Sequence, residues 1–198
     1  MNEGFGFFNR EVRTFFAAAL CFTASGLTAY ADEQPVSRNQ LVAMLEGGET
    51  DLSNLDLRGL DITGLDSSGA NLFGVDMRNA DLSDAKLRGC NLDMALLRGA
   101  NLTRADLRDT SLFSTVLAEA TLRNSDLRGA RLMGNLQGAD LEGANLADLS
   151  GADLTGVTLT DAILSEAVVE NAVFRDVKGL SSVQGFDSVR GKSLAEFD

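Results

Sequence analysis

The chain has 198 residues and a formal net charge of −12, with 29 acidic and 17 basic side chains. It contains no histidine, which excludes catalysis that depends on a histidine base and excludes metal sites built from imidazole. The acidic balance disfavours nucleic-acid backbones and anionic lipid headgroups as partners.

Residues 1–31 predict an export signal. Arg10 and Arg13 precede an uncharged apolar stretch that ends in Ala29-Tyr30-Ala31. A basic region, an apolar region and an A-x-A motif are typical of a cleaved secretory signal. We therefore expect a mature chain that begins at Asp32 in the periplasm or another extracytoplasmic compartment. The alternative is an uncleaved membrane anchor, although the stretch is interrupted by Ser, Thr and Gly and is marginal for a hydrocarbon core of ~30 Å.

Residues 32–49 predict a linker and an N-terminal capping helix. Ser37 and Gln40 have capping-box spacing, and Gly47-Gly48 marks the end of the helix. The apolar face of this helix comprises Leu41, Met44 and Leu45. An amphipathic helix here can cover the apolar end of the repeats that follow.

From Leu52 to Leu132 a large apolar residue recurs at every fifth position, with Ser67 as the exception. We call this apolar residue the central residue of its repeat. The residue two positions before it is mostly small, and the residue directly before it is mostly Asp or Asn. Gly is frequent two positions after it. A period of five fits neither a helix at 3.6 nor a strand at 2.0. The pattern indicates short sides with two inward residues each, separated by corners where Gly tolerates positive φ.

The triplets Ala70-Asn71-Leu72, Ala80-Asp81-Leu82 and Ala100-Asn101-Leu102 match the motif A-(D/N)-L-x-x literally. On these residues the chain resembles the pentapeptide-repeat proteins, and the resemblance covers residues 50–176. It implies an all-β solenoid, a right-handed quadrilateral β-helix with one pentapeptide per side, twenty residues per coil and short capping segments. It also implies that central and small residues face inward, whereas their neighbours face outward.

The period slips once, because Leu132 and Leu154 are twenty-two residues apart. We interpret this interval as one bulged coil with two extra residues. Residues 177–198 are predicted to fold over the end of the repeats as a C-terminal cap. The apolar residues of this cap are Leu180, Val183, Phe186, Val189, Leu194 and Phe197.

Two sets of arginines recur every twenty residues, which predicts two vertical ladders on opposite sides. The sets are Arg58, Arg78 and Arg98, and Arg88, Arg108 and Arg128. Aspartates flank both ladders, so we expect the arginines to neutralise neighbouring aspartates and favour this role over a surface where a partner docks. Apolar residues at outward positions form the candidate interaction surface, because aligned exposed apolar side chains favour contact with a partner. These residues are Leu96, Val116, Phe73, Phe113, Ile163, Val168 and Val173. For the last three, burial under the C-terminal segment is favoured over a subunit interface.

The sequence predicts no catalytic, cofactor-binding or metal-binding residue, because the aspartates recur at one repeat position that the fold explains. Cys90, the one cysteine after residue 31, is expected to be a small buried residue without a disulfide.

We expect an exported, non-catalytic structural or protein-interaction module without a cofactor. Its partner would be an unidentified protein or a second copy bound through the C-terminal side, not nucleic acid, and a membrane only if residues 1–31 stay attached. The alternative is a DNA-mimicking inhibitor or protector of DNA gyrase, as in the quinolone-resistance members of the family.

Overall fold

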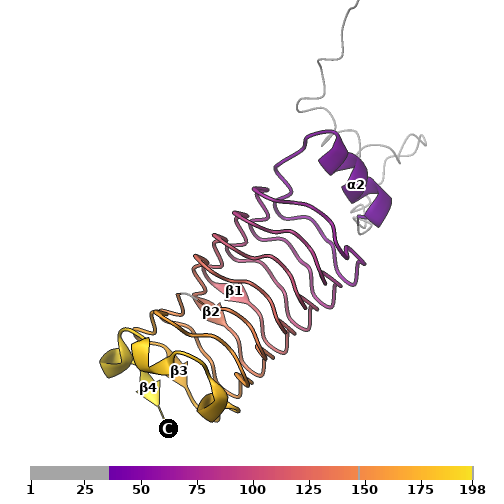
Figure 1. The fold of residues 1–198 in the computed structure, drawn as a ribbon. Helices are drawn as coiled ribbons and strands as arrows, with labels where there is room; N and C mark the ends of the chain where they lie inside the picture. The colour runs from indigo at the N-terminus through magenta and orange to yellow at the C-terminus, as the bar shows by residue number, and fades with distance from the viewer. Residues whose placement is uncertain (1–35, 147, 198) are drawn as a thin grey trace, which may run out of the picture. The chain divides into compact units, whose positions relative to one another are not determined.

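A computed structural model describes residues 36–146 and 148–197. The predicted signal at residues 1–31 lies outside this part of the chain. Within the described residues, no helix has the length and apolar character needed to cross a membrane. The chain from α2 (Arg38–Glu46) onward forms a single stack of coils, which ends at β4 (Glu196–Phe197) (Figure 1).

Each coil makes four short parallel contacts with the next coil, one on each side. In the first coil Asp51, Asp56, Asp61 and Asp66 each pair with the residue twenty positions later. We name the sides A to D after the central residues of this coil, which are Leu52, Leu57, Ile62 and Ser67. The longer contacts join β1 (Thr115–Val116) to β2 (Gly134–Asn135) and β3 (Val173–Phe174) to β4, all on side B. A coil of four sides and twenty residues agrees with the period in the sequence.

The corners explain the polar residues of the repeat. At a typical corner the Leu60 N–H donates to the Leu57 carbonyl over 3.2 Å, and Gly59 between them has φ of 63°. The Asp or Asn before each centre accepts the backbone N–H two residues later, as from Ser83 N to Asp81 Oδ1 over 2.9 Å. This is an Asx turn, which satisfies a backbone donor that the short side leaves unpaired. The recurring aspartates therefore stabilise corners.

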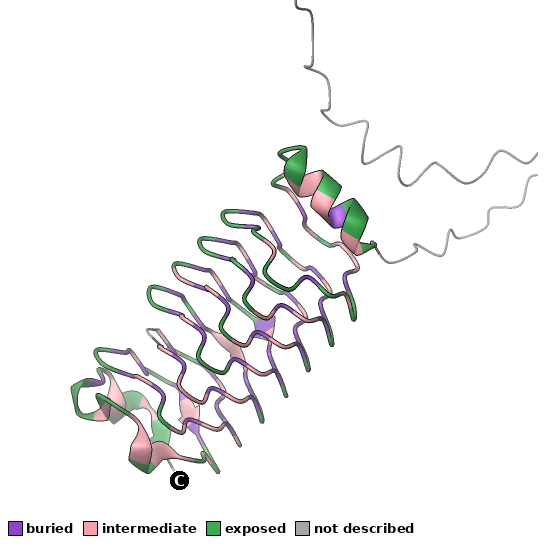
Figure 2. Cartoon of the chain, turned by 45° about the vertical axis from the view of Figure 1, so that its right-hand side comes forward, coloured by how far each residue is buried: buried purple, intermediate pink, exposed green. Residues whose placement is uncertain are grey.

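The stack is filled by the central residues and the small residues two positions earlier, both buried as predicted (Figure 2). Leu102 and Ala100, for example, are fully buried. In the first coil the large and the small residue exchange places on side D, because the central residue is Ser67 and the residue two positions earlier is Leu65. Ser67 is 8% exposed and Leu65 packs against the core. The exchange keeps one large and one small inward side chain on that side.

Helix α2 has the predicted capping box, in which Ser37 and Gln40 each bond to the backbone of the other. Leu41 is buried, and Met44 and Leu45 pack against the same core. The backbone leading into the helix is tied to the first coil, since Val36 N donates to the Asp56 carbonyl over 3.0 Å. The helix therefore covers the N-terminal end of the leucine column.

The prediction of a bulged coil is wrong, because the coil that begins near Leu132 is shorter than twenty residues and not longer. Leu132 lies on side A and Leu154 on side B, so the twenty-two residues between them span five sides. All leucines of this interval are buried: Leu132, Leu136, Leu141, Leu146, Leu149 and Leu154. The sides after Leu132 and Leu146 are shortened to four and three residues, and Arg131 pairs with Asp148 only seventeen positions later. Shorter sides keep every leucine inside, whereas a bulge would expose some of them.

The C-terminal segment also differs from the predicted cap, since it continues the stack as one more coil. One residue on each side of this coil pairs with a residue of the previous coil. The residues are Lys178, Gln184, Arg190 and Glu196, and the sequence separation from their partners increases from twenty to twenty-three residues. The added residues form 3₁₀ turns at the corners, η1 (Leu180–Ser182), η2 (Phe186–Ser188) and η3 (Lys192–Leu194). Val189 is buried in this coil, and the Phe197 ring stacks on Phe174 with centroids 4.8 Å apart.

Candidate interaction surface

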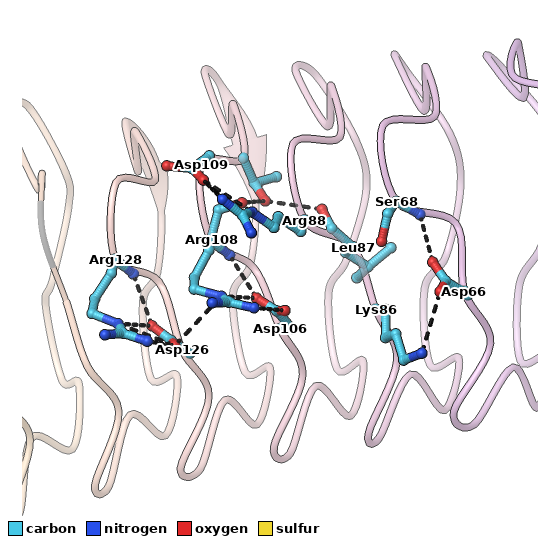
Figure 3. A network of polar contacts seen from close by, with 11 residues as sticks. Asp66, Ser68, Lys86, Leu87, Arg88, Asp106, Arg108, Asp109, Asp126 and Arg128 are labelled. Carbon is cyan, nitrogen blue, oxygen red and sulfur yellow. Dashed lines mark hydrogen bonds and ion pairs between the residues drawn. The ribbon is translucent and has the colours of Figure 1, made fainter.

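The arginine ladders are sets of ion pairs. On side D the Arg108 guanidinium bonds to Asp106 over 2.6 and 2.7 Å and reaches Asp126 of the next coil at 3.7 Å (Figure 3). On side B, Arg58 pairs with Asp56 and Arg78 with Asp76, each at 2.6 Å. The predicted charge compensation is therefore confirmed on both sides.

These ion pairs predict acid sensitivity. Hydrogen bonds from Arg108 and Arg128 hold the pKa of the Asp106 and Asp126 carboxyls below the ordinary value, and Asp56 and Asp76 have lowered pKa values for the same reason. A carboxyl whose pKa is lower in the folded state stabilises the fold above its unfolded pKa of about 3.9 and loses that contribution as the pH falls through its folded pKa. The melting temperature is expected to fall below about pH 4.

The matched variant for this test replaces the four aspartates with asparagine, which keeps the Asx-turn oxygen but cannot lose a charge. Its melting temperature should fall less steeply with acid than that of the wild type. Equal acid slopes in thermal melts of the two proteins would show that these pairs do not contribute.

An apolar strip follows the corner between sides A and B. Leu96 and Val116, both half-buried, replace aspartate in the outward column of side B and pair with each other across adjacent coils. Phe73 and Phe113 are 39% and 49% exposed and lie two coils apart on side A. Met94 lies at the corner between them and is 55% exposed. We call these five residues the apolar strip.

Met94 is the member that sequence reasoning missed. It occupies the corner position where Gly is frequent, and its φ of 59° shows that it adopts the left-handed conformation. The sequence pattern that could have identified Met94 is a large apolar residue at a corner position that favours Gly or Asn.

Asp93 lies between the two phenylalanines for a structural reason. Its carboxylate accepts the Phe113 N–H over 2.8 Å and the Ser111 hydroxyl over 2.6 Å. Because side A has Ser111 where Asp or Asn usually stands, Asp93 supplies the missing acceptor from the neighbouring coil. Asp93 therefore belongs to the framework that orients the strip.

The structure does not bring Ile163, Val168 and Val173 together with the strip or with each other. They lie on sides D, A and B respectively, and each is half-buried. The last coil places polar partners directly beneath them: Gln184, Arg190 and Glu196. The three residues therefore lie on three different sides of the coil, and the C-terminal coil pairs beneath all of them, in line with the favoured expectation of burial under the C-terminal segment. The larger exposed apolar groups at this end are Leu194 and Phe197.

Cys90 has the predicted buried position. It is 2% exposed, its thiol donates to the Ser67 carbonyl over 3.0 Å, and burial raises its pKa to about 11. Alkylation is expected to leave Cys90 unmodified in the folded protein at pH 8 and to modify it fully in denaturant, as read by mass spectrometry of its peptide. Rapid labelling without denaturant would mean that the core opens locally.

Among the residues that the structure describes, no group of three or more Cys, Asp or Glu side chains is placed to hold a metal ion.

The family model of pentapeptide repeats matches this chain in eight copies, over residues 50–89, 80–117, 105–146 and 147–176. Similar solved structures include the pentapeptide-repeat protein Rfr23 from the cyanobacterium Cyanothece 51142, with 22% identity, 79% of this chain and 97% of that chain covered, and a TM-score of 0.39. HetL from Nostoc sp. strain PCC 7120 has 24% identity to this chain and a TM-score of 0.24. The match covers 81% of this chain and 94% of HetL.

A trypsin-treated form of QnrB1, a plasmid-mediated fluoroquinolone resistance protein, has 19% identity to this chain and a TM-score of 0.45. The match covers 71% of this chain and 86% of the QnrB1 chain. A search of curated proteins gives no match. The family model spans more than half of the chain, and its repeats coincide with the buried five-residue period of the structure. The chain belongs to the pentapeptide-repeat family.

Proposed function

We propose that this protein is an exported, non-catalytic interaction module that works by presenting the apolar strip to a protein partner. The observation that carries the proposal is the strip itself, in which exposed apolar side chains stand next to columns of ion pairs such as Arg58 with Asp56. Burying such a surface is worth about 25 cal/mol per Å² before the costs of association, so the strip has an energetic reason to be covered. The fold proposed with it is the right-handed quadrilateral β-helix.

The export part of the proposal is supported by the basic and apolar character of residues 1–31 and by Ala29-Tyr30-Ala31. Mass spectrometry of the protein from separated cell fractions tests it. The expected result is an extracytoplasmic protein whose N-terminus is Asp32. An intact N-terminus in the cytosolic fraction would overturn export.

Gyrase inhibition by DNA mimicry has less support from the surface. A mimic of duplex DNA needs rows of carboxylates that stand in for phosphates, and here arginines pair with such carboxylates on two sides. Asp106 and Asp126 on side D are examples, each with a guanidinium at 2.6 Å. The aspartate columns of sides B and D therefore present paired charges and not a row of bare carboxylates.

The interaction proposal is tested by Leu96→Asp with Val116→Asp. Aspartate is the residue that this column has at Asp56 and Asp76, so the double variant should keep the fold and melting temperature. It is expected to lose the protein partner that co-purifies with the wild type. The matched control is Ile163→Asp with Val168→Asp, which makes the same change at equivalent positions outside the strip and should keep the partner. Partner binding that survives in the first variant would overturn the proposal.

A further inference from the structure

Met94 occupies a corner whose backbone conformation favours other residues. Its φ of 59° is the left-handed conformation, which costs free energy for a side chain that makes no local polar contact. In the part of the chain that the structure describes, the other non-glycine residues with positive φ are all Asn, Asp, Glu, Arg or Ser. The fold therefore has no need of a methionine at this corner, and the reason for Met94 lies in the surface that it presents.

The Met94 side chain is open to solvent at the centre of the apolar strip. The corner residues of the coils before and after it are small, Gly74 and Ser114. Backbone bonds of 2.9 Å hold the three corners in one column, from Gly74 N–H to the Asp93 carbonyl and from Met94 N–H to the Phe113 carbonyl. Met94 is 55% exposed, more than either phenylalanine of the strip. Its thioether is therefore accessible to small molecules in solution.

The other methionines of the described residues are better shielded. Met77 is 1% exposed in the leucine column, and Met44 of α2 packs against the same core. Met133 is half-buried, and its Cε lies 3.4 Å from the position that a Cβ atom would take at Gly151. An oxidant must reach the sulfur atom to react with it, so an oxidant in solution meets Met94 first.

We propose that Met94 is a site of reversible oxidation by peroxides and that its sulfoxide form releases the partner of the apolar strip. This inference rests on the proposed function, since it states how binding through the strip is regulated. Hydrogen peroxide transfers one oxygen atom to Sδ: a sulfur–oxygen bond forms, the peroxide O–O bond breaks, sulfur loses two electrons and water leaves. A sulfoxide reductase reverses the step, because two of its thiols become a disulfide and the oxygen leaves as water.

The sulfoxide changes binding without changing the fold. Its oxygen is a hydrogen-bond acceptor that water satisfies in the free protein, and an apolar partner surface would cover it without offering a donor. Other corners of the same conformation hold polar side chains, so a polar group at Met94 suits the backbone. A sulfoxide at Met77 would instead place a polar group in the leucine column. Oxidation of the folded protein is therefore a local change at the strip.

Peptide mass spectrometry of the purified full chain in dilute hydrogen peroxide tests the site. We expect sulfoxide to form at Met94 at least tenfold faster than at Met44 or Met77, with no change in melting temperature. In denaturant the rates at the three methionines should become equal. If Met94 in the folded protein is oxidised no faster than Met77, the inference is overturned.

Retention on a phenyl resin tests whether oxidation removes the apolar character of the strip. The oxidised wild type is expected to elute at a higher salt concentration than the untreated protein, and sulfoxide reductases that act on both epimers should restore its retention. Met94→Leu keeps an apolar side chain that peroxide does not oxidise, so its retention should not change. Met133→Leu is the matched control and should respond like the wild type. A peroxide shift that persists in Met94→Leu would place the effect at another residue.

Photo-crosslinking in cells separates this inference from the proposed function. A photoreactive amino acid at position 96 is combined with Met94→Gln, whose amide is polar like a sulfoxide, or with Met94→Leu. We expect at least tenfold less crosslinked protein with Met94→Gln and an unchanged yield with Met94→Leu. Equal yields from the two variants would overturn the inference and leave the proposed function in place. No crosslink from position 96 in a chain that keeps Met94 would overturn the proposed function, and the regulation of the strip with it.

Discussion

Replacing Leu102 with aspartate is expected to unfold the solenoid or to leave it folded only at low temperature. Leu102 is fully buried in the leucine column. Loss of a buried leucine alone costs about 2–5 kcal/mol, and an unpaired carboxylate among apolar side chains adds several more. The sum approaches the whole stability of a small domain, about 5–15 kcal/mol. Thermal and urea unfolding followed by circular dichroism measures the loss.

The neighbouring change Asn101→Ala is the matched control. Asn101 faces outward, accepts from Thr103 and donates to Asp81 of the previous coil. Its loss removes polar contacts at the surface and is expected to cost about 1–2 kcal/mol. If Asn101→Ala destabilised the protein more than Leu102→Asp, the assignment of inward and outward positions would be wrong by one residue.

Gly134→Ala is expected to destabilise the shortened coil by about 1–3 kcal/mol, the usual cost of overpacking. A methyl group added at Gly134 would lie 2.3 Å from the backbone oxygen of Thr115, in the contact between β1 and β2. A backbone oxygen cannot rotate away as a side chain can, so the two coils must move apart. The free energy of unfolding from urea titration gives the size of the effect.

The control for this change is Gly64→Asn. A Cβ atom added at Gly64 meets no atom within 4 Å, and the φ of 66° is close to the value that asparagine adopts at other corners, such as Asn54 and Asn79. Its cost should stay within about 0.5 kcal/mol, as for ordinary surface changes. Equal costs at the two glycines would mean that the close approach of the shortened coil is relaxed in solution.

The sequence predicted the parts of the fold that the five-residue period controls. Burial of the central leucines, the corners and the pairs such as Arg58 with Asp56 all follow from a repeat in which every coil has the same environment. The slip after Leu132 could not be predicted in the same way. A gap of twenty-two residues fits both a bulge on one coil and shortened sides, and only the three-dimensional contacts show that each leucine starts its own side.

The C-terminal coil and the contact surface were harder to predict for a related reason. Residues after Phe174 lack the repeat, so their sequence showed apolar content without showing that the backbone keeps pairing. The strip was predicted in part, since Leu96 and Val116 interrupt a column of aspartates. Met94 was missed because its role depends on a corner conformation. Ile163 was named together with the strip because apolar character alone does not say which side a repeat faces, although burial under the C-terminal segment was the favoured expectation for it.

Photo-crosslinking in living cells tests most directly whether the protein works through this surface. A photoreactive amino acid at position 96 lies on the strip, and the same group at position 86 lies at the equivalent outward position of side D. We expect crosslinked protein, either with a second copy or with another protein, from position 96 and none from position 86. Crosslinks from position 86 alone would contradict it.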